Sequence, residues 1–302
     1  MKITQINNLS NEIYHNSAEY KDYWSSSNLK EYPNTPREAY YQKYVAPSKT
    51  SHAMDLGSCM HDFLASKHVK GQPFGWNVFE PPINHTTGKY YGVESQKYKD
   101  AVLSVIDPIS ADDMELINDI WQIIIHSDYR WFFEQEILSK GIAEASFFVD
   151  GLHKYKYRPD VVTDKFIFDY KTITKKYWNV QGLKYQIEDR GYDISASFYQ
   201  YFEHQRTGIW KPFYIIWLMK DPPFDILISD ISEYCFEPNN GEPIVNSGAM
   251  VFKKLKDQHE ACQLTGHYPG LANQFDAWNG LRVPKFSPRY DRGFNEFELE
   301  ND

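Results

Sequence analysis

Three acidic residues and a lysine between positions 144 and 171 have the types and spacing of a catalytic metal site: Glu144, Asp160, Asp169 and Lys171. Asp169 and Lys171 lie two residues apart in a short apolar run, so a strand would point both side chains to the same face. Two charges at the end of a buried strand cost free energy unless they pair or meet a cation. Because Mg²⁺ prefers carboxylate oxygens, the pattern predicts a Mg²⁺ site in which Mn²⁺ can substitute. An Asp-x-Lys pair alone is commonly solvated charge at a strand end, so the prediction depends on the whole set.

Three consecutive strands are predicted to position these acids. Residues 143–149 alternate as a strand does, Asp150-Gly151 favours a hairpin turn, and residues 155–161 form the returning strand. A second turn at 163–165 leads into the apolar run 166–171. The three acids then lie one on each strand, where they can converge.

A helix upstream could complete the site. Residues 50–67 carry an apolar stripe at helical spacing, formed by Leu56, Met60, Phe63 and Leu64. Gly57 and His61 are four residues apart and share a neighbouring face. Glycine in a helix costs about 1 kcal/mol relative to alanine, which favours a close approach to the backbone at Gly57. The alternative is that Gly57 relieves a helix crossing and that His61 is a half-buried packing residue.

Together these motifs resemble the PD-(D/E)XK nuclease superfamily and, within it, the exodeoxyribonuclease VIII (RecE-like) group of phage and prophage recombination exonucleases. The resemblance covers most of the chain, and the order and spacing of its short motifs make it specific. The matching segments are EIYH at 12–15, SSSNLK at 25–30, TPREAY at 35–40, LGSCMH at 56–61, EAS at 144–146, KYRPD at 156–160 and DYKT at 169–172.

This resemblance implies metal-dependent hydrolysis of DNA phosphodiester bonds. Asp160, Asp169, the backbone carbonyl of Tyr170 and His61 would hold the metal, and Glu144 would complete the site. The metal would lower the pKa of the attacking water.

Lys171 would orient that water or offset the charge on the phosphate. The residues with supporting or DNA-binding roles would be Gly57, Arg158, Thr172, Ser195 and Tyr199.

The resemblance further implies a 5′ to 3′ exonuclease that acts on the ends of double-stranded DNA. A ring-like homo-oligomer and a single-strand annealing protein as partner would accompany that activity. These expectations rest on the family alone.

One position departs from the family pattern. Nucleases of this group usually carry Gln-x-x-x-Tyr on the helix that follows the Asp-x-Lys strand. Here Tyr199 is present, but Ser195 stands at the glutamine position. This departure and the acidic charge support an alternative, a catalytically silent DNA- or protein-binding member of the same fold. For Tyr199 the alternative is an ordinary core aromatic.

The fold class expected is α/β, a restriction-endonuclease-like core with a mixed central sheet flanked by helices and a helical N-terminal elaboration. No linker divides the 302 residues, so one domain is expected, with a mostly helical part (1–140), a catalytic sheet core (141–236) and a C-terminal helix and tail (237–302). Further helices are predicted at 93–106, 111–126, 128–139, 178–189, 192–206 and 244–264, strands at 211–219 and 224–236, and a long loop at 72–92.

The charge and the cysteine content limit where the protein can work and what it can bind. The three scattered cysteines argue for a reducing compartment, and no signal peptide or membrane-spanning run is apparent, so a soluble cytoplasmic protein is expected. The net charge of −9 is unusual for a DNA enzyme. It predicts that basic residues are confined to a channel.

Overall fold

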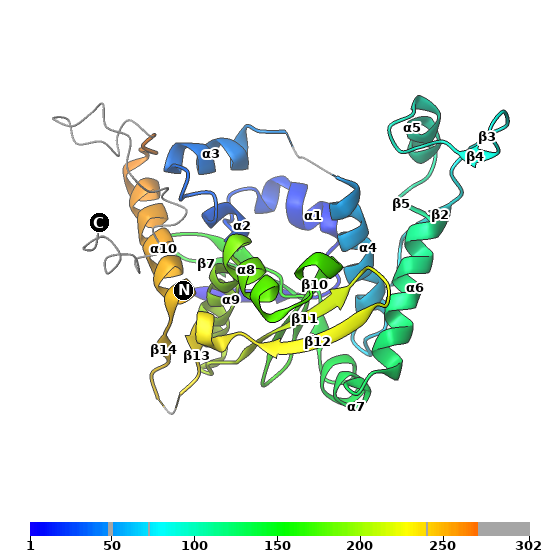
Figure 1. Cartoon of the computed structure of the whole chain (residues 1–302). Coiled ribbons are helices and arrows are strands. Elements are labelled where there is room, and N and C mark those ends of the chain that lie inside the picture. Colours follow the sequence, from blue (N-terminus) through cyan, green and yellow to red (C-terminus); the bar gives the residue numbers. More distant parts are fainter. Residues whose placement is uncertain (48–50, 72, 240, 271–302) are drawn as a thin grey trace, which may run out of the picture.

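A mixed β-sheet between helical layers forms the centre of the protein (Figure 1), described here by a computed structural model for residues 1–47, 51–71, 73–239 and 241–270. The five strands of this sheet lie in the order β12 (Asp225–Asp230), β11 (Phe213–Met219), β10 (Ile167–Ile173), β9 (Val161–Val162) and β6 (Ile142–Ala143). β10 and β11 are parallel, and the other neighbours are antiparallel. The predicted mixed α/β fold is confirmed.

A second, antiparallel sheet contains β1 (Lys2–Ile6), β7 (Ser146–Asp150) and β8 (Tyr155–Tyr157). The predicted strands 143–149 and 155–161 are therefore each divided between two sheets. The first breaks at Glu144, whose φ of 51° lies in the left-handed region. The second breaks around Pro159, which has no N–H to donate to a ladder. The prediction of two unbroken strands is wrong, and the acids lie at the junction between the sheets.

One face of β10 carries the charged site residues, and the opposite face carries a core residue. Asp169 and Lys171 border a cavity on the face that α9 (Tyr192–Thr207) covers. Tyr170 points to the opposite face and packs with residues of α4 (His52–Ser66) and α6 (Ala111–His126). This alternation agrees with the strand pattern predicted from the sequence.

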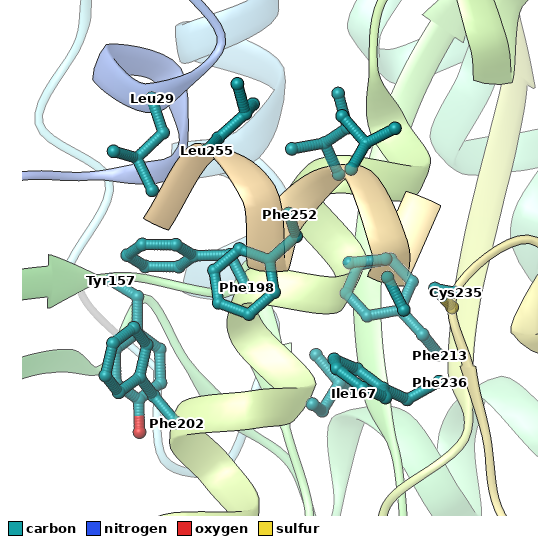
Figure 2. Packing of buried hydrophobic residues seen from close by; sticks show 14 of the residues in the cluster. Leu29, Tyr157, Ile167, Phe198, Phe202, Phe213, Cys235, Phe236, Phe252 and Leu255 are labelled. Carbon is teal, nitrogen blue, oxygen red and sulfur yellow. The ribbon is translucent and has the colours of Figure 1, made fainter. Parts of the chain in front are cut away.

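Helices cover both faces of the central sheet. Figure 2 shows Phe198 of α9 and Phe252 of α10 (Ser247–Thr265) on the side of the sheet that carries Ile167 and Phe213, with Phe202 of α9 against Tyr157 of β8. Each such side chain contributes about 1.5–3 kcal/mol when it is removed from water. α8 (Val180–Asp189) precedes α9, and the break between them is Gly191 with a φ of 61°.

The N-terminal part is less purely helical than predicted. It contains α1 (Asn11–Asn16), a 3₁₀ turn (Ala18–Tyr20), α2 (Ser26–Leu29) and α3 (Pro36–Tyr44), but it begins with β1, which pairs with β7. Thr35 caps α3 as its sequence suggests, since its hydroxyl accepts the Glu38 N–H at 3.0 Å.

Residues 73–110 form an arm that projects from the body (Figure 1). The predicted loop 72–92 contains β2 (Asn77–Phe79), β3 (Ile83–Asn84) and β4 (Lys89–Tyr90), with residue 72 outside the described residues. β2 pairs with β5 (Pro108–Ser110), and β3 pairs with β4. Strands of two or three residues give no readable alternation, which is why the loop prediction missed them.

Several boundaries also differ from the prediction. The expected helix 93–106 is shorter, α5 (Gln96–Leu103), and 128–139 is α7 (Arg130–Phe132) followed by a π-helix (Phe133–Leu138). The expected strand 224–236 ends at β12, and the chain continues as a 3₁₀ turn (Ser232–Tyr234), β13 (Phe236–Glu237) and β14 (Ile244–Val245). Another 3₁₀ turn (Lys175–Tyr177) precedes α8. Within the described ranges, no helix combines the length and the apolar character needed to cross a membrane.

A buried ionic network fastens α9 to the sheets. The Glu203 carboxylate accepts hydrogen bonds from the Tyr157 hydroxyl at 2.8 Å, from Arg206 at 2.7 and 2.9 Å, and from the Lys211 ammonium at 2.9 Å. Lys211 also donates to the Thr163 carbonyl at 2.7 Å. Burial alone would raise the pKa of Glu203, but Arg206 and Lys211 lower it, so the carboxylate stays ionised.

Glu203→Gln is expected to lower the free energy of unfolding by about 3–5 kcal/mol, because it leaves the buried Lys211 charge uncompensated. Urea unfolding measures the change. Glu233→Gln, at an exposed position, is the control and should stay within about 0.5 kcal/mol of the parent protein. Equal losses in the two variants would contradict a stabilising role for the network.

Candidate metal centre

Glu144 and Asp160 face each other where the two sheets separate. The Glu144 N–H donates to the Asp160 carbonyl at 3.0 Å, one last ladder contact before the strands diverge. The Asp160 carboxylate in turn accepts the N–H of Tyr170 at 2.6 Å. The backbone thereby fixes Asp160 between its own strand and β10.

His61 reaches this junction from α4. Its Nδ1 lies 3.2 Å from Asp160 Oδ1. The ligand atoms of His61, Glu144 and Asp160 all lie within 4.8 Å of one another, close enough to share one metal ion. One imidazole nitrogen and two carboxylates fit a divalent cation, because carboxylates suit Mg²⁺ and Mn²⁺ and neutral imidazole also binds divalent metals.

Asp169 and Tyr170, which were predicted as metal ligands, both contact Lys171 in the structure. The Lys171 ammonium contacts the Asp169 carboxylate and also donates to the Tyr170 carbonyl at 3.2 Å. Lys171 thus occupies both groups that were expected to join His61 and Asp160 as metal ligands. In the structure Glu144, not Asp169, completes the three-residue group.

The carboxyl groups of the junction differ in charge state. Burial and the charge of Asp160 raise the pKa of Glu144 to about 8, although His61 and Arg158 act against the shift. Burial also favours a neutral Asp160, but His61, Lys171 and the Tyr170 N–H outweigh it and hold the pKa of Asp160 at about 2. Asp160 is therefore the permanently ionised acid of the group.

The pKa values of Asp169 and His61 are also set by burial and by neighbouring charges. Burial, with a smaller contribution from Asp160, raises the pKa of Asp169 to about 6 against the opposing charge of Lys171. Burial alone would lower the pKa of His61, but its charge interaction and hydrogen bond with Asp160 raise it to about 9. A bound cation would oppose a charged His61 and favour ionised carboxylates.

Arg158 braces the junction and does not project freely into the cavity. Its guanidinium donates to Ser146 Oγ at 2.9 Å, to Asn11 Oδ1 at 2.6 Å and to the Leu9 carbonyl at 3.0 Å. One of its nitrogens lies 4.0 Å from Glu144. Arg158 therefore ties the segment before α1 to the acid that the sheet junction presents.

A cavity of about 970 Å³ opens over the site. Ser195 and Tyr199, one helical turn apart on α9, both line it, and the Tyr199 hydroxyl bonds to the Ser26 side chain. Thr172 is half-buried, follows the alternation of β10 to the Tyr170 face, and is not among the lining residues. The structure thus places Ser195 and Tyr199, but not Thr172, beside the acids.

Gly57 does not have the close neighbour that its position suggested. No atom lies within 4 Å of the place where a Cβ would be. His61 reaches the junction because Met60 and Leu64 of α4 pack into the core beside β10, so a glycine is not what permits the approach. No neighbouring part of the protein, outside the helix itself, makes the close approach that the sequence suggested at Gly57.

Only part of the basic lining of the cavity was identified from the sequence. Arg158 and Lys171 were assigned site roles, whereas Lys30 and Lys156 lie in the motifs SSSNLK and KYRPD without an assigned role. Lys21 and Lys43 lie in none of the motifs. The basic side chains come from five separate segments and are Lys21, Lys30, Lys43, Lys156, Arg158 and Lys171. The same cavity is also lined by the carboxylates of Glu12, Asp62, Glu144, Asp160 and Asp169, so its lining is mixed in charge.

The fold is that of a PDDEXK-like domain. The chain belongs to the family described as "PDDEXK-like domain of unknown function (DUF3799)", whose model matches residues 25–268. A crystal structure from Eubacterium rectale, described as a "putative exonuclease", is similar over 92% of this chain and 95% of its own, with 16% sequence identity and a TM-score of 0.54. No curated protein matches the chain in sequence.

His61→Ala and Asp160→Asn are each expected to weaken Mn²⁺ binding at least about tenfold, since each removes one ligand of the group. Isothermal titration calorimetry measures the dissociation constant. Asp164→Asn, in the exposed turn before β10, is the matched control and should bind as the parent does. Parental affinity in His61→Ala would return His61 to a packing role.

Proposed function

We propose that the protein is a metal-dependent deoxyribonuclease that hydrolyses phosphodiester bonds. The observation that carries this proposal is the meeting of His61, Glu144 and Asp160 beside the Asp169–Lys171 pair in a cavity lined by cations. Membership of a PDDEXK-like family supports it.

The acidic group would hold Mg²⁺ or Mn²⁺ through Asp160, Glu144 and His61, with Asp169 within reach if Lys171 releases it. A divalent cation supplies positive charge that stabilises the phosphate in the transition state, and it acidifies water. Hydrolysis adds the oxygen of water to phosphorus and breaks one P–O bond, and the departing oxygen takes up a proton.

Lys171 would act on the phosphate itself. Its ammonium is held by Asp169 and the Tyr170 carbonyl at the edge of the cavity, so it needs little reorganisation to face an anion there. A pre-positioned charge of this kind stabilises negative charge that develops in the transition state. Asp169 would then serve chiefly to orient Lys171.

The finer assignment is to a RecE-like exonuclease. The order and spacing of the motifs support 5′ to 3′ degradation from the ends of linear double-stranded DNA, in phage or prophage recombination. A homo-oligomer and a single-strand annealing protein as partner form part of the same proposal. The similar Eubacterium rectale structure, itself described as a "putative exonuclease", supports exonuclease action over internal cleavage.

A silent binding protein is the second candidate. Ser195 stands in the cavity where the related nucleases carry glutamine, and it is this observation that favours the alternative. Such a protein would bind DNA without Mg²⁺-dependent degradation.

Asp169→Asn and Lys171→Met are expected to lower the rate of Mg²⁺-dependent degradation of linear duplex DNA by at least about 100-fold, because electrostatic stabilisers are worth that much. The assay uses a duplex whose two ends carry different labels, so that it also reports polarity. The controls are Asp164→Asn and Lys165→Met, an adjacent exposed pair. Undiminished rates in both site variants would exclude the assigned roles, and an inactive parent protein would favour the silent candidate.

Ser195→Gln is expected to raise the rate several-fold or to lower the Mg²⁺ concentration needed, because glutamine is longer and offers both a donor and an acceptor. Tyr199→Phe, which removes the hydroxyl, should reduce the rate. The same end-labelled assay over a Mg²⁺ series measures both. If neither variant changes rate or metal dependence, this face of α9 serves packing alone.

A further inference from the structure

Two lysines face the cavity from the wall that the N-terminal helices and β8 form. The Lys156 ammonium donates to the Tyr14 carbonyl at 2.5 Å and lies 4.5 Å from the centre of the Tyr14 ring. The Lys43 ammonium donates to the Tyr23 carbonyl at 2.7 Å and lies 5.2 Å from the Trp24 ring. All these partners are neutral.

Neither lysine belongs to any of the ion pairs found among the described residues. Burial lowers the pKa of Lys43 to about 7, and the charge of Lys156 lowers it further, while Asp22 acts weakly the other way. Burial and the charge of Arg158 lower the pKa of Lys156 to about 8. Among the described residues, the two ammonium groups are thus held in the cavity wall by neutral partners and without an ion pair.

An anion in the cavity would offset this cost. Burying a cation without a counter-charge is unfavourable, and an acidic protein has ample carboxylates with which it could have paired these lysines. Each ammonium has three N–H groups, and the Tyr14 carbonyl uses one of those on Lys156. Donors therefore remain that can face the cavity.

The surroundings of Lys43 suit an oxyanion. Its ammonium lies 3.5 Å from Asn28 Oδ1, which also accepts a hydrogen bond from the Ser25 hydroxyl at 3.0 Å. Ser25, Ser27 and Asn28 all line the same cavity. Hydroxyl and amide groups next to a cation provide the hydrogen-bond donors that phosphate oxygens accept.

The row of cations continues towards the acidic group but remains distinct from it. Arg158 lies 4.0 Å from Glu144, and its charge acts on Lys156, whose charge in turn acts on Lys43. Consecutive phosphates of a nucleic acid strand follow one another every few ångströms. A strand with one phosphate at the acids can therefore present another to this wall.

We propose that Lys43 and Lys156 bind a phosphate of the substrate strand at a second anion site, on the cavity wall apart from the metal centre. The identity of the ligand as nucleic acid rests on the proposed function. The binding itself does not need the metal.

The test is DNA binding in EDTA over a series of NaCl concentrations, by fluorescence anisotropy. Each lost phosphate contact makes the slope of log K against log[salt] shallower by about 0.7–0.9. Lys43→Met and Lys156→Met should each make the slope shallower, and the double variant, which loses the whole phosphate contact, should show the full change. Lys165→Met, at an exposed position, should keep the parental slope. A parental slope in the double variant would overturn the proposal.

Two further variants separate charge from folding. Lys156 is only 5% exposed, so thermal unfolding must accompany Lys156→Met. Lys156→Arg keeps the charge and is expected to retain the parental slope. If Lys156→Met does not fold, Lys43→Met decides, and a parental slope there overturns the proposal.

Comparing DNA with a 5′-phosphate and the same DNA with a 5′-hydroxyl shows whether the bound phosphate is terminal or internal. A loss confined to 5′-phosphorylated DNA identifies a terminal phosphate, and an equal loss with 5′-hydroxyl DNA identifies an internal one. If the parent protein does not degrade DNA in Mg²⁺ but the slopes change, the nuclease proposal fails and the phosphate site stands. If the parent protein degrades DNA and the slopes do not change, the nuclease proposal stands and the phosphate site fails.

Discussion

The backbone contact between Glu144 and Asp160 is the constraint on which the site depends. It is the last hydrogen bond before two neighbouring strands leave one sheet and enter another. A continuous ladder would have kept both side chains within a sheet face, where core residues cover them. The left-handed backbone of Glu144 and the missing N–H of Pro159 end the ladder at this point. The two carboxylates therefore emerge in the gap between the sheets.

Neighbouring charges then decide which acid is ionised without a metal. His61, Lys171 and the N–H of Tyr170 stabilise the ionised form of Asp160, and together they outweigh the effect of burial on its pKa. For Glu144, burial and the charge of Asp160 outweigh the opposing charges of His61 and Arg158, so its pKa is raised. Without a metal ion, no single positive group of the described residues contacts all the carboxylates of the site. A divalent cation supplies that charge from one position, which a flexible lysine cannot do.

The sequence predicts the elements that repeat locally and misses those that depend on distant pairing. Alternation in β10 is enough to place Asp169 and Lys171 on one face, and the apolar stripe of α4 is enough to define the helix that carries His61. The strand breaks could not be predicted, because a left-handed glutamate has no sequence signal and β1, far away in the chain, provides the partner for β7. For the same reason the sequence does not show that Glu144 lies close enough to His61 and Asp160 to share a metal ion with them. Lys43 and Lys156 meet only through tertiary packing.

In the proposed function, the two charged parts of the cavity have to be separate for a polyanion to bind. Carboxylates repel phosphate until a cation neutralises them, so the acidic centre would attract DNA only when metal is bound. The lysines of the wall, when protonated, attract phosphate without a metal ion, because their hydrogen-bond partners are neutral carbonyls. In a chain of net charge −9, long-range attraction by the whole surface is not available, and the local cations must provide it. Placing the wall next to the centre, but outside it, lets the strand dock independently of the ion.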